Sequence, residues 1–245
     1  MNIIFVHGEK GGVGKSMSAM ALIEHCRGLG LNPFLIEGDT GIPDVASRYR
    51  GVIDGVQIPL SRPDLSEEAI GELLELLESN LDDLAGRPVV VNLPAGAAST
   101  VDRSAAMIRA VCDAAGWEVV TLYLLGAGIE SSTSAIESLS AGLAGVSDRK
   151  IALRNLAFGD PNRWPWTRDG HQEAWISAGG QALDFAELTG RTVEKIRGSG
   201  PLGPLISGEE PGLFLVDRSI LHRWLSAFEP IIEAAGLVGR GGDDE

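Results

Sequence analysis

The sequence has few cysteines, few aromatic residues and no long apolar run. Its two cysteines, Cys26 and Cys112, are far apart and lie in helix-like surroundings, so they offer neither a disulfide framework nor a Cys-x-x-Cys metal site. No stretch approaches the ~20 uninterrupted apolar residues of a membrane-spanning helix, and the N-terminus lacks a basic flank and a cleavage site. We therefore expect a cytoplasmic protein without a membrane helix, in a reducing compartment.

Positive charge is also scarce. The chain has 20 Lys and Arg against 34 Asp and Glu, which gives a net charge of −14. Such a chain repels polyphosphate backbones unless its cations cluster, so DNA is disfavoured as the main partner although the sequence does not exclude it. Many of the acids lie in residues 66–85, which contain no Lys or Arg. We interpret this segment as a solvated helix face rather than a docking site.

The apolar residues, 44% of the chain, form short runs that alternate with helical patterns. This alternation is typical of a doubly wound, mostly parallel sheet flanked by helices, which binds ligands at the carboxyl ends of its strands. The sequence therefore predicts an α/β fold. The expected strands are 2–7, 33–36, 89–91, 119–125 and 150–153, and the expected helices are 15–29, 64 or 66 to 84, 103–115 and 131–144.

The pattern is less regular in residues 51–63 and beyond Asn155. Residues 158–180 contain three tryptophans among Pro, Asn and Gly. For this segment, packing of a long loop is favoured over a partner surface or a lid on a nucleotide base. Residues 198–212 are rich in Pro and Gly and are expected to form a second loop.

A last helix is expected over residues 217–235, with an interruption at Pro230. Its apolar residues favour packing against the core over membrane targeting, because a helix that binds anionic lipid needs a more basic face. We expect one domain over residues 1–238 and a disordered acidic tail over residues 239–245.

A glycine-rich segment, Gly8-Glu9-Lys10-Gly11-Gly12-Val13-Gly14-Lys15-Ser16, lies between the first expected strand and the first expected helix. Glycines in this context let backbone N–H groups turn inward around a β-phosphate, toward which the following helix points its positive end. Lys15 is then expected to reach the β- and γ-phosphates, and the Ser16 hydroxyl to bind Mg²⁺. The predicted nucleotide-binding residues in this segment are Glu9, Lys10, Gly11, Gly12, Val13, Gly14, Lys15, Ser16 and Met17.

The common G-x-x-x-x-G-K-[ST] pattern would place a glycine at position 9, where this chain has Glu9. The segment Lys10-Gly11-Gly12-x-Gly14-Lys15-Ser16 instead resembles the deviant Walker A motif of the ParA/MinD group of P-loop ATPases. The resemblance implies ATP or ADP with Mg²⁺ as ligands. It also implies that Lys10 reaches across a homodimer to the nucleotide of the partner.

A second segment resembles the first switch of that family. In Glu37-Gly38-Asp39-Thr40-Gly41-Ile42-Pro43-Asp44, Asp39 matches the retained aspartate of the family's D-x-D-like pattern, and Glu37 replaces the first one. By this resemblance, Asp39 holds the Mg²⁺ shell or orients the attacking water. The alternative is a turn residue that satisfies its own loop backbone. Asp44 is a lesser candidate.

A third segment, Val89 to Gly96, resembles the family's Walker B strand and second switch, with Asn92 in place of the aspartate. An amide can accept a hydrogen bond from a magnesium-bound water but brings no charge, so nucleotide binding is expected more firmly than hydrolysis. Asn155 follows the strand 150–153, where the family often has an asparagine that bonds adenine. Asn155 is alternatively a plain strand terminator.

The resemblance implies an ATP-dependent homodimer that hydrolyses ATP slowly, with Lys10, Lys15 and Asp39 as catalytic residues and Ser16, Asp39 and Asn92 at the metal. The dimer would switch affinity for an unidentified protein partner in plasmid partition, mobilisation or transfer. The acidic charge weakens the partition reading, so accessory proteins of the TraL and MobD type fit better. Two alternatives stay open: a nucleotide-binding scaffold with little hydrolysis because of Asn92, and a small-molecule kinase.

Overall fold

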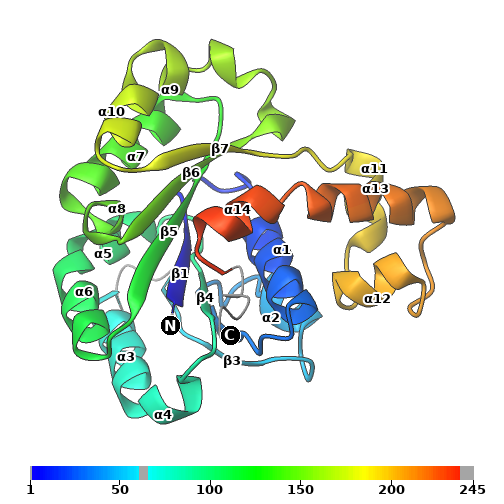
Figure 1. The fold of residues 1–245 in the computed structure, drawn as a ribbon, viewed down its shortest axis with the longest axis horizontal. Helices are drawn as coiled ribbons and strands as arrows, with labels where there is room; N and C mark the ends of the chain where they lie inside the picture. Colours follow the sequence, from blue (N-terminus) through cyan, green and yellow to red (C-terminus); the bar gives the residue numbers. More distant parts are fainter. Residues whose placement is uncertain (1, 61–65, 238–245) are drawn as a thin grey trace, which may run out of the picture.

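The computed structural model of the protein describes residues 2–60 and 66–237. Its centre is a seven-stranded sheet in the order β3-β2-β4-β1-β5-β6-β7 (Figure 1). Every strand pairing is parallel, so the predicted α/β architecture is confirmed. The strands are β1 (Asn2–His7), β2 (Phe34–Glu37), β3 (Asp54–Gln57), β4 (Val89–Asn92), β5 (Glu118–Leu125), β6 (Arg149–Asn155) and β7 (Gln181–Phe185).

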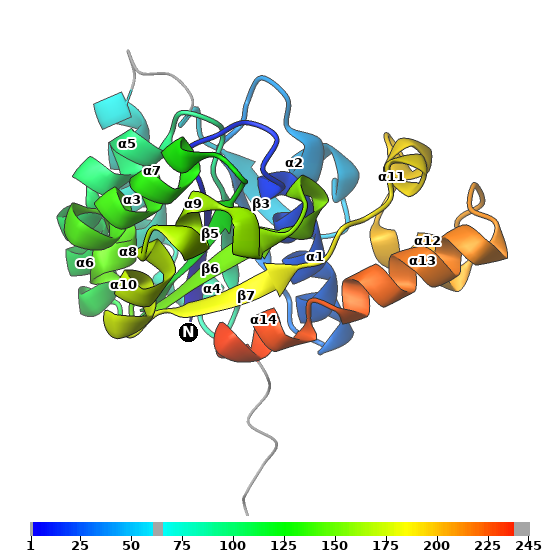
Figure 2. The same cartoon turned by 90° about the horizontal axis from the view of Figure 1, so that it is seen from above.

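Helices cover both faces of the sheet, as the view in Figure 2 shows. One group, which includes α1 and α14, packs on one face, and another, which includes α3 and α6, packs on the other. The α-helices are α1 (Lys15–Gly28), α2 (Asp44–Arg48), α3 (Ser66–Ser79), α4 (Leu81–Leu84), α5 (Ala98–Arg103), α6 (Ala105–Ala114), α7 (Ile129–Ala141), α8 (Leu143–Val146), α9 (Pro165–Arg168), α10 (His171–Ser177), α11 (Gly190–Ile196), α12 (Leu202–Ser207), α13 (Leu215–Ser226) and α14 (Glu229–Ala234).

The central strand β1 explains why apolar runs mark the inner strands. Ile4 and Val6 belong to the core beneath α1 and α14, whereas Ile3 and Phe5 belong to the core beneath α3 and α6. Successive side chains of a strand point to opposite faces, so a strand covered by helices on both sides must be apolar at every position.

The two edge strands are absent from the sequence-based prediction. Residues 54–57, expected to be irregular, form β3, and residues 181–185 form β7. Most side chains of β3 are exposed, and β7 has a single fully buried residue, Phe185. Neither strand therefore has the apolar run on which the prediction depended.

Several expected helices are divided in the structure. The segment 131–144 is divided into α7 and α8 at Gly142, where the backbone is extended and the Asp102 carboxyl approaches closely. The last helix ends at Ser226 and resumes as α14, whose second residue is Pro230, close to the expected interruption. Residues 198–212, expected as a loop, contain α12. Asp64 and the expected tail lie outside the described residues.

The three tryptophans of residues 158–180 are buried. Trp164, Trp166 and Trp175 share a core cluster with Tyr123 and Leu125 of β5. Instead of a long loop, the segment folds as two 3-10 turns followed by α9 and α10. The interpretation that these residues serve packing is confirmed for the tryptophans themselves.

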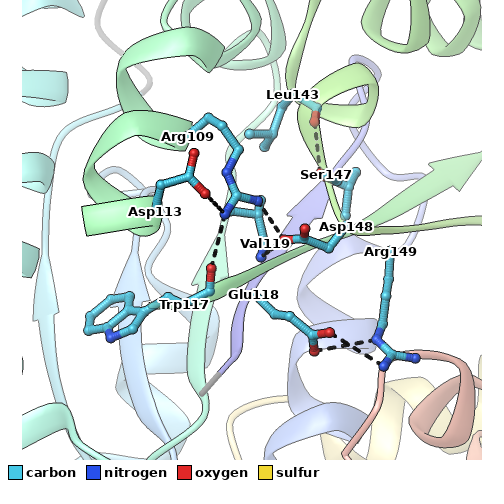
Figure 3. A network of polar contacts seen from close by, with 10 residues as sticks. Arg109, Asp113, Trp117, Glu118, Val119, Leu143, Ser147, Asp148 and Arg149 are labelled. Carbon is cyan, nitrogen blue, oxygen red and sulfur yellow. Dashed lines mark hydrogen bonds and ion pairs between the residues drawn. The ribbon is translucent and has the colours of Figure 1, made fainter. Parts of the chain in front are cut away.

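An ion network holds the amino ends of β5 and β6 together, at the sheet edge remote from the glycine loop (Figure 3). Arg109 of α6 donates to Asp113, Asp148 and the carbonyl oxygen of Trp117. Asp148 also accepts the backbone N–H of Val119 at 2.8 Å. Burial opposes ionisation of Asp148, but these hydrogen bonds prevail and hold the pKa of its carboxyl below the usual value.

We expect Arg109→Met to lower the free energy of unfolding by about 1 kcal/mol, because the pairs are partly exposed and screened by solvent. In the unmodified protein, the depressed pKa of Asp148 contributes to the free energy of unfolding. This contribution is present above the pKa that Asp148 has in the unfolded chain, and it is lost as pH falls through the pKa of Asp148 in the folded protein. Urea unfolding at neutral and acidic pH measures both effects. Arg103→Met, at the exposed end of α5, is the control and should leave stability unchanged.

Within the described residues, no helix is both long and apolar enough to cross a membrane. The start of α13 exposes Leu215 and Val216, whereas the apolar residues farther along the segment pack in the core. Leu221, Trp224, Phe228, Ile231 and Ile232 are all buried there.

Candidate functional site

The glycine loop lies at the carboxyl edge of the sheet, between β1 and α1. Gly8, Gly12 and Gly14 have φ values of 143°, 76° and 105°, which side-chain-bearing residues rarely adopt. No residue other than glycine has a positive φ among those described, so Glu9 occupies its position without backbone strain. The three glycines turn the loop back on itself at the N-terminus of the 14-residue helix α1, the geometry that binds phosphate.

The Lys15 side chain lies inside this loop and donates hydrogen bonds to its backbone. Its side chain is buried, and Nζ donates to the carbonyl oxygens of Gly8 at 2.8 Å and Lys10 at 2.9 Å. Burial lowers the pKa of Lys15 to about 8, while the carboxylates of Glu9 and Asp39 oppose the decrease. A cation is therefore held in the loop by neutral carbonyl groups, which a phosphate can replace as a stronger partner.

A cavity of about 310 Å³ adjoins the loop. Its walls bring together the predicted phosphate-binding segment and the two predicted switch segments. The lining residues are Gly11, Gly12, Gly14, Lys15, Ser16, Met17, Asp39, Asp44, Asn92, Leu93, Pro94 and Ala95.

Asp39 hydrogen-bonds to its own loop and also lines the cavity. Its Oδ1 accepts the backbone N–H groups of Gly41 at 3.1 Å and Ile42 at 3.0 Å, so the carboxylate satisfies its own loop. The same residue lines the cavity together with Ser16 and is close enough to Lys15 to influence its pKa. The loop bonds orient the carboxylate at the cavity wall.

Glu37 and Asn92 form a buried pair that the sequence analysis missed. They end the neighbouring strands β2 and β4 at registered positions, and Asn92 Nδ2 donates to Glu37 Oε1 at 2.7 Å. Glu37 also accepts the backbone N–H groups of Asp39 and Ala46. Burial raises the pKa of Glu37, although these hydrogen bonds oppose the increase. The signal for the pair was present in the sequence, because both residues directly follow apolar strand runs.

The Asn155 side chain at the end of β6 stabilises the glycine loop by a hydrogen bond. Its Nδ2 donates to the carbonyl oxygen of Val13 at 2.8 Å, and its Oδ1 accepts the N–H of Ala157 at 3.0 Å, which caps the turn after β6. A Cβ on Gly14 would lie 2.8 Å from this Nδ2, so the close approach requires glycine there. The amide is thus engaged in positioning the loop.

The remaining predicted residue, Lys10, lies on the exposed outer side of the loop. Its Nζ is 3.9 Å from the position of a Cβ on Gly128, just before α7. Unlike the ammonium group of Lys15, this side chain is available to solvent at the open edge of the site.

The oxygen donors at the cavity suit Mg²⁺. Ser16, Asp39 and Asn92 line it, and the buried Asn92 Oδ1 has no hydrogen-bond partner among the described residues. In that part of the chain, no group of three or more His, Cys, Asp or Glu could hold a metal by itself. Mg²⁺ typically keeps several waters and takes phosphate oxygens with one or two protein ligands, so this sparse donor set fits a nucleotide-borne metal.

The chain is similar to known proteins over nearly its whole length. No protein-family model matches the chain. Protein MobD of Acidithiobacillus ferrooxidans is 25% identical over 236 residues, which are 95% of this chain and 96% of MobD. Among solved structures, the fold is similar to MinD from Pyrococcus horikoshii complexed with Mg-ADP, with 15% identity, coverage of 96% and 98% of the two chains, and a TM-score of 0.53.

A second similar fold is that of an ATP complex of a McdA variant from Cyanothece, with 13% identity, coverage of 99% of each chain and a TM-score of 0.51. These structures share the fold, and the relative extends over nearly the full length. The chain therefore has the fold of MinD and McdA, its glycine loop resembles the deviant Walker A motif of the ParA/MinD group, and it is similar to MobD over nearly the full length of both proteins.

Proposed function

We propose that this protein binds ATP with Mg²⁺ at the glycine loop and acts as a nucleotide-gated dimeric switch that hydrolyses ATP slowly. The observation that carries the proposal is the buried Lys15 ammonium held inside a glycine loop at the N-terminus of α1. A loop of this shape offers backbone N–H groups and one cation to a chain of phosphates. Lys10, on the open side, is free to reach the phosphates of a second subunit.

The residues that would contribute to phosphoryl transfer are Lys15, Asp39 and the pair of Glu37 and Asn92. Lys15 balances the charge of the phosphates, Asp39 holds the attacking water or the metal shell, and Asn92 bonds a metal-bound water. Mg²⁺, when bound, neutralises the charge that develops on the phosphate oxygens. Asn155 keeps the loop in place beside the expected position of the adenine.

For the biological role, we propose plasmid mobilisation or transfer, with a protein as the partner of the dimer. The support is the nearly full-length similarity to MobD and the net charge of −14, which disfavours a DNA-binding partition role. We propose further that residues 1–238 act as one P-loop domain, since the sheet and the C-terminal helix α14 share a core.

The solution mass measured by light scattering tests the switch. We expect a monomer without nucleotide or with Mg-ADP and a dimer with Mg-ATP, and we expect Lys10→Ala to stay monomeric with Mg-ATP. Lys150→Ala, at the opposite edge of the sheet, is the matched control and should dimerise normally. A mass that does not respond to nucleotide would contradict the dimeric switch.

A second candidate, a nucleotide-binding scaffold with little or no turnover, is favoured by one observation. Position 92 carries an uncharged amide where the resembled motif has an aspartate. Phosphate release with saturating Mg-ATP separates the two functions, because a scaffold binds nucleotide without releasing phosphate. A phosphorylated acceptor formed in place of free phosphate would instead indicate the small-molecule kinase.

A further inference from the structure

We propose that Glu37 is a positioning residue whose buried carboxylate turns the Asn92 amide so that its carbonyl oxygen, Oδ1, faces the nucleotide cavity and the metal. The inference rests on the proposed nucleotide-binding function. In this arrangement the negative charge of this part of the site comes from Glu37, at the end of β2, and not from the residue at the end of β4.

The hydrogen bond between the two side chains determines the orientation of the amide. Glu37 already accepts the backbone N–H groups of Asp39 and Ala46, so its oxygens act as hydrogen-bond acceptors and face the NH₂ end of the amide. Asn92 Nδ2 lies 2.7 Å from Glu37 Oε1. The reverse orientation would place two oxygens in contact in a buried site, because Glu37 is fully buried and Asn92 is 2% exposed.

The other end of the amide is left for a ligand. Asn92 Oδ1 is buried and has no hydrogen-bond partner among residues 2–60 and 66–237. A buried acceptor without a partner costs free energy, so a donor is expected there in the functional state. Asn92 lines the cavity together with Ser16 and Asp39, and a water bound to Mg²⁺ is a strong O–H donor.

Glu37 is itself firmly held. Its Oε1 also accepts the N–H of Asp39 at 3.3 Å, and its Oε2 accepts the N–H of Ala46 at 3.2 Å. These bonds tie the carboxylate to Asp39 in the loop and to Ala46 in the helix α2 that follows it. A fixed carboxylate behind the amide polarises it and increases the negative charge on Oδ1, which partly replaces the charge of an aspartate.

An aspartate at position 92 would conflict with this arrangement. Glu37 and Asn92 are partners in the register of β2 and β4, so two carboxylates would meet inside the protein. In the absence of a bound cation, two carboxylates that close disfavour each other's ionisation. An exchange of the two roles, with an amide at position 37 and a carboxylate at position 92, would restore one donor and one acceptor.

The test is a double-mutant cycle of the unmodified protein, Glu37→Gln, Asn92→Asp and the double variant. The binding of a fluorescent ADP is measured with Mg²⁺ and with EDTA, and the melting temperature is measured without nucleotide. We expect Mg²⁺ to strengthen ADP binding about tenfold less in Glu37→Gln than in the unmodified protein, with binding in EDTA unchanged. Asn92→Asp should melt at a lower temperature, and the double variant should recover both the melting temperature and the Mg²⁺ effect.

A full Mg²⁺ effect in Glu37→Gln would overturn the positioning role, as would a double variant no better than Asn92→Asp. Glu118→Gln, at the amino end of β5, is the control and should behave like the unmodified protein. If the unmodified protein binds no ADP, the proposed function fails as well. Normal ADP binding with a Mg²⁺ effect that does not depend on residue 37 overturns the positioning role alone.

A spectroscopic measurement keeps the proposal testable if a variant does not fold. The side-chain NH₂ of Asn92 should be protected from solvent exchange in the NMR spectrum of the unmodified protein, both with and without Mg-ADP, because it faces Glu37. Assignment can use selective ¹⁵N labelling of asparagine with Asn155 as the second buried reference. Rapid exchange of the Asn92 NH₂ in either state would contradict the proposed orientation.

Discussion

Replacement of Lys15 by alanine is expected to weaken nucleotide binding by roughly 100-fold or more, because a charge-assisted bond to phosphate inside a buried loop is lost. Lys15 has no role in the core, and its buried ammonium is costly to the free protein, so the variant should fold. Titration calorimetry with Mg-ADP measures the loss. Lys10→Ala is the control and should bind ADP normally, since Lys10 is exposed and is assigned to the partner's nucleotide.

The low pKa of Lys15 adds a dependence on pH. With a pKa of about 8, the unliganded site loses its positive charge above that pH, so ADP affinity should fall by up to about tenfold per pH unit there. Lys15→Met should lose this pH dependence. Constant affinity of the unmodified protein from pH 7 to pH 9.5 would contradict the assignment.

The free energy of unfolding of the nucleotide-free protein should rise with pH over the range in which the ADP affinity falls. Lys15 has a lower pKa when folded than its ordinary value of 10.5, so between about 8 and 10.5 the unfolded chain binds more protons. The contribution of this group to the free energy of unfolding therefore rises across that window. Comparison of unfolding curves with those of Lys15→Met isolates this contribution from other groups that titrate there.

Trp175→Ala is expected to destabilise the protein by about 3–5 kcal/mol. The side chain is fully buried, and its Nε1–H donates to the carbonyl oxygen of Gln181 at 3.1 Å. Its ring also packs edge-on against Tyr123 and Trp166. Domains are typically stable by only about 5–15 kcal/mol, so the change should remove a large part of the total. Urea unfolding, or the yield of folded protein, measures the effect.

The neighbouring Ile176 is the control for this prediction. It is 49% exposed on the same helix, α10, and Ile176→Ala should change stability by less than about 0.5 kcal/mol. If Trp175→Ala keeps its full stability but loses a partner or the nucleotide, the segment is a binding surface instead. That result would contradict the packing interpretation of the buried tryptophans.

The phosphate-binding segment could be predicted from the sequence because its determinants are local. The glycines and Lys15 lie within nine residues, and the hydrogen bonds of Lys15 connect groups at most seven residues apart. The inner strands were predictable for a similar reason. A strand buried on both faces, such as β1, must be apolar throughout, and such a run is visible without knowledge of its neighbours.

The edge strands and the helix breaks depended on surroundings that the sequence does not display. β3 and β7 each pair with one neighbour through backbone hydrogen bonds, which depend little on the identity of the side chains. Gly142 divides α7 from α8 next to a carboxyl that comes from α5, about forty residues earlier in the chain. Local propensity does not contain such information.

The amino-acid sequence by itself determined the α/β class, the glycine loop and the candidate residues along the carboxyl edge of the sheet. Only the tertiary structure decided how those residues are paired. Glu37 meets Asn92 because β2 and β4 are neighbours in the sheet, although 55 positions separate them. Asn155 reaches the loop at Val13 across 142 positions. The order of strands in the sheet brings these side chains together, and it results from the packing of the whole chain.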